Sequence, residues 1–302
     1  MNIVPRIPIT TAMITSSSVT DVADYDESNS YSAGNMVKDP TTFVQYESQI
    51  GSNLGNDPTT DDGTYWLAVG YANSRRMFDG ALGANATYGK TEKATSIVVV
   101  LEIDTLFTSV GVFGVEGASV TLEIVEDSQT IYDETVSMVR TDDVENVWDY
   151  MFTEPEYKTA YVFASVPGFS GTIVTLTISA PGSTARIGEA IFGYGRKIGE
   201  TLAGSGPLIK DYSIKEANDF GEYTIVERAY SRGANMVVGI NPQDTDRITR
   251  ILEENRATIC LFYPDSDMEH YGLTVVGFYR SFEPGLIHRG IVPVTIPIEG
   301  IT

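Results

Sequence analysis

Residues 118–138 read ASVTLEIVEDSQTIYDETVSM and carry the clearest structural signal in the chain. Val120, Leu122 and Ile124 alternate with polar residues, which is the period of a strand with one buried face. A second β-rich run follows a short turn at residues 127–129. The stretch therefore predicts a β-hairpin, and we expect an antiparallel architecture around it.

Similar β-rich runs lie on both sides of this hairpin. They are residues 96–104 (SIVVVLEID), 159–166 (TAYVFASV), 171–180 (GTIVTLTISA) and 185–193 (ARIGEAIFG). Strands of this length, separated by turns, are typical of an antiparallel β-sandwich and not of a parallel sheet between helices. We predict such a sandwich over residues 81–197, within a chain that is mainly β.

The segment 31–80 is rich in aromatic, glycine and turn residues, and it has no helical pattern. It predicts a small β module. Its aromatic side chains either build the core of this module or present flat faces to a partner or a sugar ring. Tyr65 and Trp66 are adjacent, so on a strand they face opposite sides and one of them is a candidate for exposure. The candidate ligand-binding residues are Tyr65, Trp66 and Tyr46.

The two ends of the chain have different patterns. Residues 1–30 start extended and end in the polar run SSSVTDVADYDESNS. We expect an arm there that becomes ordered only when something else holds it. Residues 198–302 predict a mixed α+β domain with an extended tail over 291–302 and one helix. Asn241 and Pro242 suit the start of that helix.

Composition limits the class of protein. The chain has 302 residues, enough for two or three domains, and a formal net charge of −21. Such an acidic protein repels phosphate backbones, so we expect no tight nucleic-acid binding. No apolar run approaches the roughly 20 residues of a membrane span, and the N-terminal pattern is not that of a secretory signal. We expect synthesis in the cytoplasm and no membrane insertion.

Residues suited to catalysis are few. The histidines are His270 and His288, and no nucleophile motif accompanies either of them. The single cysteine, Cys260, has apolar neighbours and predicts a buried, inert thiol. Zinc needs several Cys or His ligands at close spacing. We therefore expect no enzyme activity, no metal and no cofactor.

Three glycines form a pattern that resembles a nucleotide-binding loop. Gly193, Gly195 and Gly199 are spaced G-x-G-x-x-x-G. No amphipathic helix follows to offer its N-terminus to a phosphate, and no G-K-[ST] sequence is present. A loop between domains explains these glycines better.

Several motifs in order along the chain carry a resemblance to a known family. The 31–79 segment begins Y-x-x-G-x-x-V at Tyr31 and ends N-x-x-x-M-F-D at Asp79. It resembles a recurring module of tailed-bacteriophage virion proteins and is similar to small chitin-binding-type modules. The usual Trp near its end is replaced by the run Ser74-Arg75-Arg76.

The resemblance continues beyond residue 95. Residues 96–197 resemble the galactose-binding-type β-sandwich, of jelly-roll kind, that follows the module in these phage proteins. The residues that carry this part are Trp148, Tyr150, Phe152, Glu154-Pro155 and Arg186-Ile187-Gly188-Glu189. The third part is carried by Gly199, Thr201, Asp211-Tyr212-Ser213, Lys215, Asp219-Phe220-Gly221, Arg228 and the closing GFYRSFEP.

The resemblance implies a function without catalytic residues. It implies a structural protein of the virion, in the tail or the head–tail neck, that forms a homo-oligomer with other virion proteins as partners. The extended segments 1–30 and 291–302 would add strands to neighbouring subunits. The alternative is a carbohydrate-binding host-attachment protein of a tail fibre or tail tip, with a host-surface glycan as ligand. A glycan-degrading enzyme is the third and least supported option.

Overall fold

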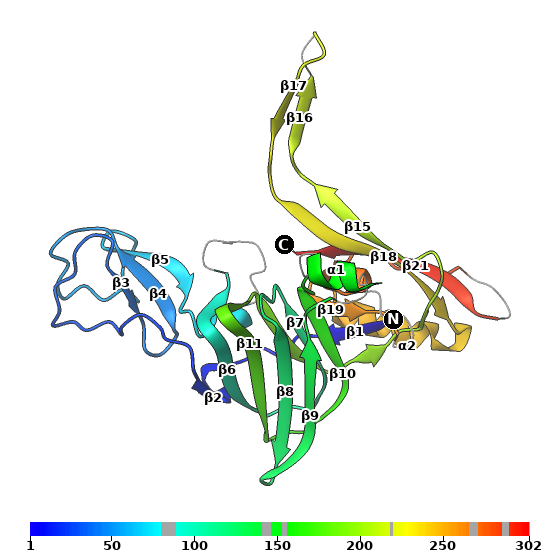
Figure 1. Ribbon diagram of the computed structural model, residues 1–302, viewed down its shortest axis with the longest axis horizontal. Coiled ribbons are helices and arrows are strands. Elements are labelled where there is room, and N and C mark those ends of the chain that lie inside the picture. The colour runs from blue at the N-terminus through cyan, green and yellow to red at the C-terminus, as the bar shows by residue number, and fades with distance from the viewer. Residues whose placement is uncertain are drawn as a thin grey trace. The chain divides into compact units, whose positions relative to one another are not determined.

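The chain forms two compact units, which we describe separately. Unit 1 comprises Met1–Ile7 and Ile191–Thr302, and unit 2 comprises Pro8–Ala190. The structure, a computed structural model, describes residues 1–79, 89–140, 146–152, 156–217, 220–265, 271–285 and 290–301. Figure 1 shows a chain made mainly of β-strands, as the sequence predicts.

Unit 2 contains a five-stranded and two three-stranded sheets. The five-stranded sheet has the order β2-β6-β11-β8-β9, and the others have the orders β10-β7-β12 and β3-β4-β5. The strands are β2 (Ile14–Ser17), β3 (Met36–Lys38), β4 (Val44–Ser48), β5 (Trp66–Tyr71), β6 (Thr91–Ile103), β7 (Phe107–Phe113), β8 (Ser119–Glu126), β9 (Gln129–Ser137), β10 (Ala160–Gly168), β11 (Thr172–Ile187) and β12 (Glu189–Gly193). Short helices are η1 (Thr11–Met13), η2 (Arg76–Phe78) and α1 (Val147–Phe152).

The predicted hairpin is confirmed as β8 and β9, which pair antiparallel from Ser119 with Ser137 to Glu126 with Gln129. Asp127 and Ser128 form the two-residue turn, with φ of 47° and 65°. Positive φ at both turn residues gives the twist that suits a tight hairpin.

The side chains predicted to face inward from this hairpin are buried. Val120, Leu122 and Ile124 are fully buried. Val110 of β7 and Phe163 of β10 are buried in the same way. Burial alternates along β8, and β7 and β12 of the three-stranded sheet are buried almost throughout. Antiparallel sheets with buried apolar faces are the pattern of a β-sandwich, so this part of the fold prediction is confirmed.

Unit 1 is built on one eight-stranded sheet with the order β13-β1-β19-β20-β21-β18-β14, in which β15 also pairs with β18. Its strands are β1 (Asn2–Pro5), β13 (Arg196–Lys197), β14 (Glu200–Thr201), β15 (Gly206–Asp211), β16 (Ile214–Ala217), β17 (Tyr223–Val226), β18 (Tyr230–Ile240), β19 (Cys260–Tyr263), β20 (Val275–Tyr279) and β21 (Val292–Gly300). The helices are η3 (Pro242–Asp244), α2 (Thr245–Glu254) and η4 (Tyr271–Leu273).

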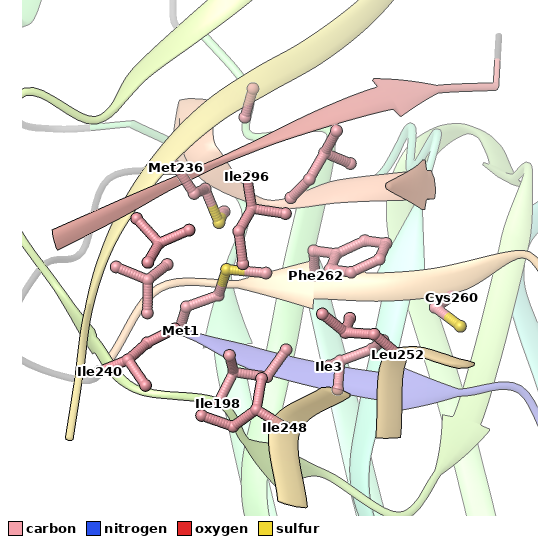
Figure 2. Close-up of a cluster of buried hydrophobic side chains, with 14 of the residues drawn as sticks. Met1, Ile3, Ile198, Met236, Ile240, Ile248, Leu252, Cys260, Phe262 and Ile296 are labelled. Atoms are coloured by element: carbon pink, nitrogen blue, oxygen red, sulfur yellow. The ribbon is translucent and has the colours of Figure 1, made fainter. Parts of the chain in front are cut away.

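The predicted helix is confirmed at residues 242–254. Asn241 caps it, since its side chain accepts a hydrogen bond from the Gln243 amide at 3.4 Å. Ile248, Ile251 and Leu252 of α2 are buried. Figure 2 shows Ile248 and Leu252 beside Ile3 of β1, so the apolar stripe of the helix covers this sheet.

The first 30 residues differ from the single extended arm that the sequence predicts. Residues 2–5 form β1, which lies between β13 and β19, and Met1 and Ile3 are fully buried. Ile14–Ser17 form β2, which pairs with β6 in unit 2. β1 is paired on both sides and β2 on one side, so strand pairing within the chain orders both segments.

The boundary between the units also differs from the prediction. The chain passes from unit 2 to unit 1 within β12, at residues 190–191, and not at residues 197–198. The predicted boundary between the aromatic module and the sandwich, at residues 80–81, lies outside the described residues. The predicted tail 291–302 contains β21, which pairs with both β18 and β20.

Candidate functional site

The small sheet β3-β4-β5 carries the three candidate ligand-binding residues. Trp66, at the start of β5, is only 2 % exposed. Its ring meets those of Tyr25 and Tyr31 edge-on, with centroids 5.8 Å and 5.3 Å away. Its indole nitrogen donates to the Asn56 carbonyl at 2.9 Å. Trp66 is therefore the centre of the module's core and not a platform for a ligand.

Tyr65 lies on the opposite side of the chain and is 37 % exposed. Leu67, two residues further along, is 50 % exposed. Residues two apart on an extended chain share a side, so these two form a small apolar surface. Tyr46 is half-buried and pairs with Ala68, on the same side as Trp66. The structure thus separates Tyr65 from Trp66 and Tyr46.

The predicted arm contributes residues to this module that sequence reasoning missed. Besides Tyr25, the Asp21 carboxylate accepts hydrogen bonds from the amide and the hydroxyl of Ser74, both at 2.7 Å. The Tyr25 amide donates to the Lys38 carbonyl at 2.9 Å. The acidic, polar composition of residues 16–30 suggested disorder, whereas Asp21 and Tyr25 attach this segment to the module.

Arg75 belongs to the run Ser74-Arg75-Arg76 that follows Asn73. The Arg75 guanidinium lies 4.2 Å from the centroid of the Phe43 ring, and the Lys38 ammonium lies 4.5 Å from it. Burial lowers the pKa of Arg75. Phe43 is therefore covered by cations and does not offer a free aromatic face.

A second surface lies in unit 1, on a long hairpin. β15 pairs with β18 and β16 pairs with β17, so residues 206–217 and 220–235 form the two sides of one two-stranded ribbon. Figure 1 shows β16 and β17 extending away from the other strands of unit 1. In register, Ile225 lies opposite Lys215, and Val226 lies opposite Ile214.

This ribbon exposes large apolar side chains. Phe220 is 91 % exposed, Tyr223 71 %, Ile209 69 % and Ile225 65 %. Leu208, Tyr212, Val226 and Tyr230 are also exposed. Residues 223–231 read YTIVERAYS, and Tyr223, Ile225 and Val226 are exposed because β17 forms a two-stranded sheet with β16, apart from the eight-stranded sheet.

Cys260 is fully buried in the core of unit 1, and burial raises the pKa of its thiol to about 12. Among the described residues, no group of three or more His, Cys, Asp and Glu side chains could hold a metal ion. His270 and His288 lie outside the described residues.

The glycine pattern at residues 193–199 has a structural explanation. A Cβ on Gly193 would collide with the Pro5 carbonyl oxygen, and one on Gly199 would collide with that of Gly239. These glycines allow backbones to approach closely inside unit 1. They therefore do not indicate a nucleotide loop.

Comparison of the chain with protein-family models, curated proteins and solved structures finds no match. Within the ranges that the structure describes, no helix is long and apolar enough to span a membrane. Two exposed apolar surfaces are therefore described: the ribbon between residues 206 and 235, and the small face at Tyr65.

Proposed function

We propose that this chain is a structural component of a tailed-bacteriophage virion, in the tail or the head–tail neck, and assembles as a homo-oligomer with other virion proteins. It is made in the host cytoplasm and has no enzyme activity. The class of particle comes from the resemblance of the sequence motifs. The observation that carries the assembly role is the apolar ribbon of unit 1.

The exposed apolar area of the ribbon is large for a monomer. Phe220 and Tyr223 alone expose about 300 Å². Together with the other exposed apolar side chains of the ribbon, the area is on the order of 900 Å². The largest apolar patch of a typical monomer is about 300–600 Å², and each partner in a standard interface buries roughly 800 Å². This area is the sum over both faces of the ribbon, so a partner that contacts both faces would bury about as much apolar surface as a standard interface.

The geometry of the ribbon also supports a role as a protein interface. Tyr223 and Ile225 share one of its faces, and Val226 lies on the other. Neither face is wholly polar, and a two-stranded hairpin without a covering layer is marginally stable in water. Packing against a partner would supply that layer.

Charge favours another copy of the same chain as the partner. Residues 206–235 contain four basic and five acidic residues, a net charge of −1, whereas the whole chain carries −21. Like-charge repulsion opposes association of such acidic molecules. It is weakest where the surface is nearly neutral, which is the case along the ribbon.

The test is the oligomeric state of the purified full chain by analytical ultracentrifugation. We expect the native chain to form oligomers and the double variant Tyr223→Ser, Ile225→Ser to dissociate into monomers. Leu106→Ser is the control, because Leu106 is 50 % exposed in unit 2. A native chain that stays monomeric at every concentration, or a double variant that assembles like the native chain, would contradict the assembly role.

Immunogold labelling of particles then tests the location, and label on the neck or tail is expected.

The alternative function is host attachment through a surface glycan, and the exposure of Tyr65 favours it. A tyrosine face beside Leu67 can stack on the apolar face of a sugar ring. Here Tyr65→Ala is expected to abolish binding on a glycan array, with Tyr71→Ala, a 42 % exposed residue of β5, as the control. Unchanged binding of the Tyr65→Ala variant would remove this site, and Trp66→Ala is not informative because Trp66 is buried.

A further inference from the structure

A hollow of about 450 Å³ lies in unit 1 between α2 and the chain around β13. Its lining includes Tyr194, Arg196, Lys197, Arg247, Arg250 and Ile251. We call it the basic pocket. Four basic side chains in one hollow are unusual here, because the whole chain has 20 Lys and Arg residues against 41 acidic ones.

The helix supplies one wall. Arg247, Arg250, Ile251 and Glu254 stand at positions i, i+3, i+4 and i+7 of α2, so they lie on one face. Ile251 is 7 % exposed and belongs to the hydrophobic core of the unit. It gives the pocket an apolar floor within a charged rim.

The opposite wall is held against the helix by two contacts. The Arg247 guanidinium donates to the Lys197 carbonyl at 3.2 Å. The Arg196 guanidinium donates to the Glu254 carboxylate at 2.9 Å. These contacts fix the chain of residues 194–197 at the rim, so the pocket exists before any ligand arrives.

The charges of the rim are only partly neutralised. Besides the Arg196–Glu254 pair, Arg247 pairs with Asp244 at 3.4 Å and Lys197 lies 3.7 Å from Asp265. Arg250 is exposed and has no hydrogen-bond or ion-pair partner among the described residues. Its guanidinium is thus free to bind two oxygens of an anion side by side.

Tyr194 supplies a second kind of contact. It is 46 % exposed and lines the same hollow, so part of its ring is available to a ligand. A ring face suits a flat or partly apolar group, such as the face of a sugar. The volume fits a small molecule. The net charge of −21 disfavours a nucleic-acid backbone.

We propose that the basic pocket binds a small ligand that carries a carboxylate or a phosphate group next to a ring. Arg250 binds the anionic group, with Lys197 and Arg247 contributing charge, and Tyr194 contacts the ring. The proposal is independent of the assembly role, since it uses neither the ribbon of residues 206–235 nor the resemblance.

The test is calorimetric titration of the full chain at low ionic strength with glucuronate, glucose 6-phosphate, glucose and inorganic phosphate. We expect at least one of the two anionic sugars to bind at least tenfold more tightly than glucose. Glucuronate alone would identify a carboxylate ligand, and glucose 6-phosphate together with inorganic phosphate would identify a phosphate ligand. Glucose binding as tightly as both anionic sugars, or no binding of any probe, would overturn the proposal.

Variants then locate the binding. Arg250→Ala is expected to weaken binding of the tighter-binding anionic sugar at least tenfold, because the substitution removes a charged hydrogen-bond donor. Arg250→Lys should lose less, since it keeps the charge. Arg256→Ala is the matched control, an exposed arginine just beyond α2 that does not line the pocket. An equal loss in Arg256→Ala and Arg250→Ala would show general attraction of anions and would overturn the assignment of this site.

Discussion

The indole nitrogen of Trp66 donates to the Asn56 carbonyl oxygen across 2.9 Å, and this bond joins β5 to the loop before it. The aromatic residue that looks most suitable for a ligand is therefore a structural one. Its neighbour Tyr25 comes from the polar N-terminal region, and Tyr31 is the first residue of the aromatic module. Any ligand contact of the module would therefore involve exposed side chains outside this cluster, such as Tyr65 and Leu67.

We expect Trp66→Ala to destabilise the aromatic module by about 3–5 kcal/mol, the usual cost of removing a buried large aromatic side chain. Tyr65→Ala should change stability by less than about 0.5 kcal/mol, because the side chain is partly exposed. Urea unfolding followed by circular dichroism measures both. Equal destabilisation by the two substitutions would contradict the placement of Trp66 in the core.

Gly300 lies against the backbone of Arg232, so that a Cβ at position 300 would overlap the Arg232 carbonyl oxygen. We expect Gly300→Ala to destabilise unit 1 by about 1–3 kcal/mol, because the neighbouring strand has to shift. Gly285→Ala is the control, since its Cβ would meet no atom within 4 Å. Thermal unfolding of the two variants should separate them, and a Gly300→Ala variant as stable as the control would argue against this close approach.

Glu116 is held by Lys90 at 2.6 Å and by Arg186 at 2.7 Å, and these hydrogen bonds lower the pKa of its carboxyl group. A carboxyl whose pKa is lower in the folded chain stabilises the fold above its unfolded pKa, near 4.5. That contribution disappears as the pH falls through the folded pKa. All three side chains are close to half-exposed, so we expect it to be at most about 1 kcal/mol.

The measurement is the difference in the free energy of unfolding between the native chain and Glu116→Gln at several pH values. The difference should be largest above about pH 5, where a glutamate in the unfolded chain is ionised, and should shrink at lower pH. Glu126→Gln, at an exposed position of β8, serves as the control. A difference that grows as the pH falls would be opposite in sign to this prediction.

The Cys260 thiol should react only when unit 1 opens. It is fully buried, and burial raises its pKa to about 12, so the thiolate is scarce at pH 8. We expect labelling by iodoacetamide in native buffer to be slow and to accelerate sharply in the urea range in which unit 1 unfolds. Rapid labelling without denaturant would show that β19 is accessible in the native chain.

Much of the fold follows from local sequence patterns. The alternation at Val120, Leu122 and Ile124 identified the hairpin of β8 and β9, because a strand with one buried face must repeat every two residues. Asn241 and Pro242 marked the start of the helix at residues 242–254, because the capping preferences of a helix are local. The mainly β class followed from many such short runs.

Only the tertiary structure decided the roles of the remaining segments. Residues 2–5 became a strand between β13 and β19, partners nearly 200 or more residues away, which no local pattern specifies. The exposure of Tyr65, the burial of Trp66 and the convergence of Tyr194 with Arg250 depend in the same way on which strands pair and which helix face packs. The sequence by itself determined the elements, because their periodicity and caps act over a few residues, whereas long-range packing decided which side chains meet and which stay exposed.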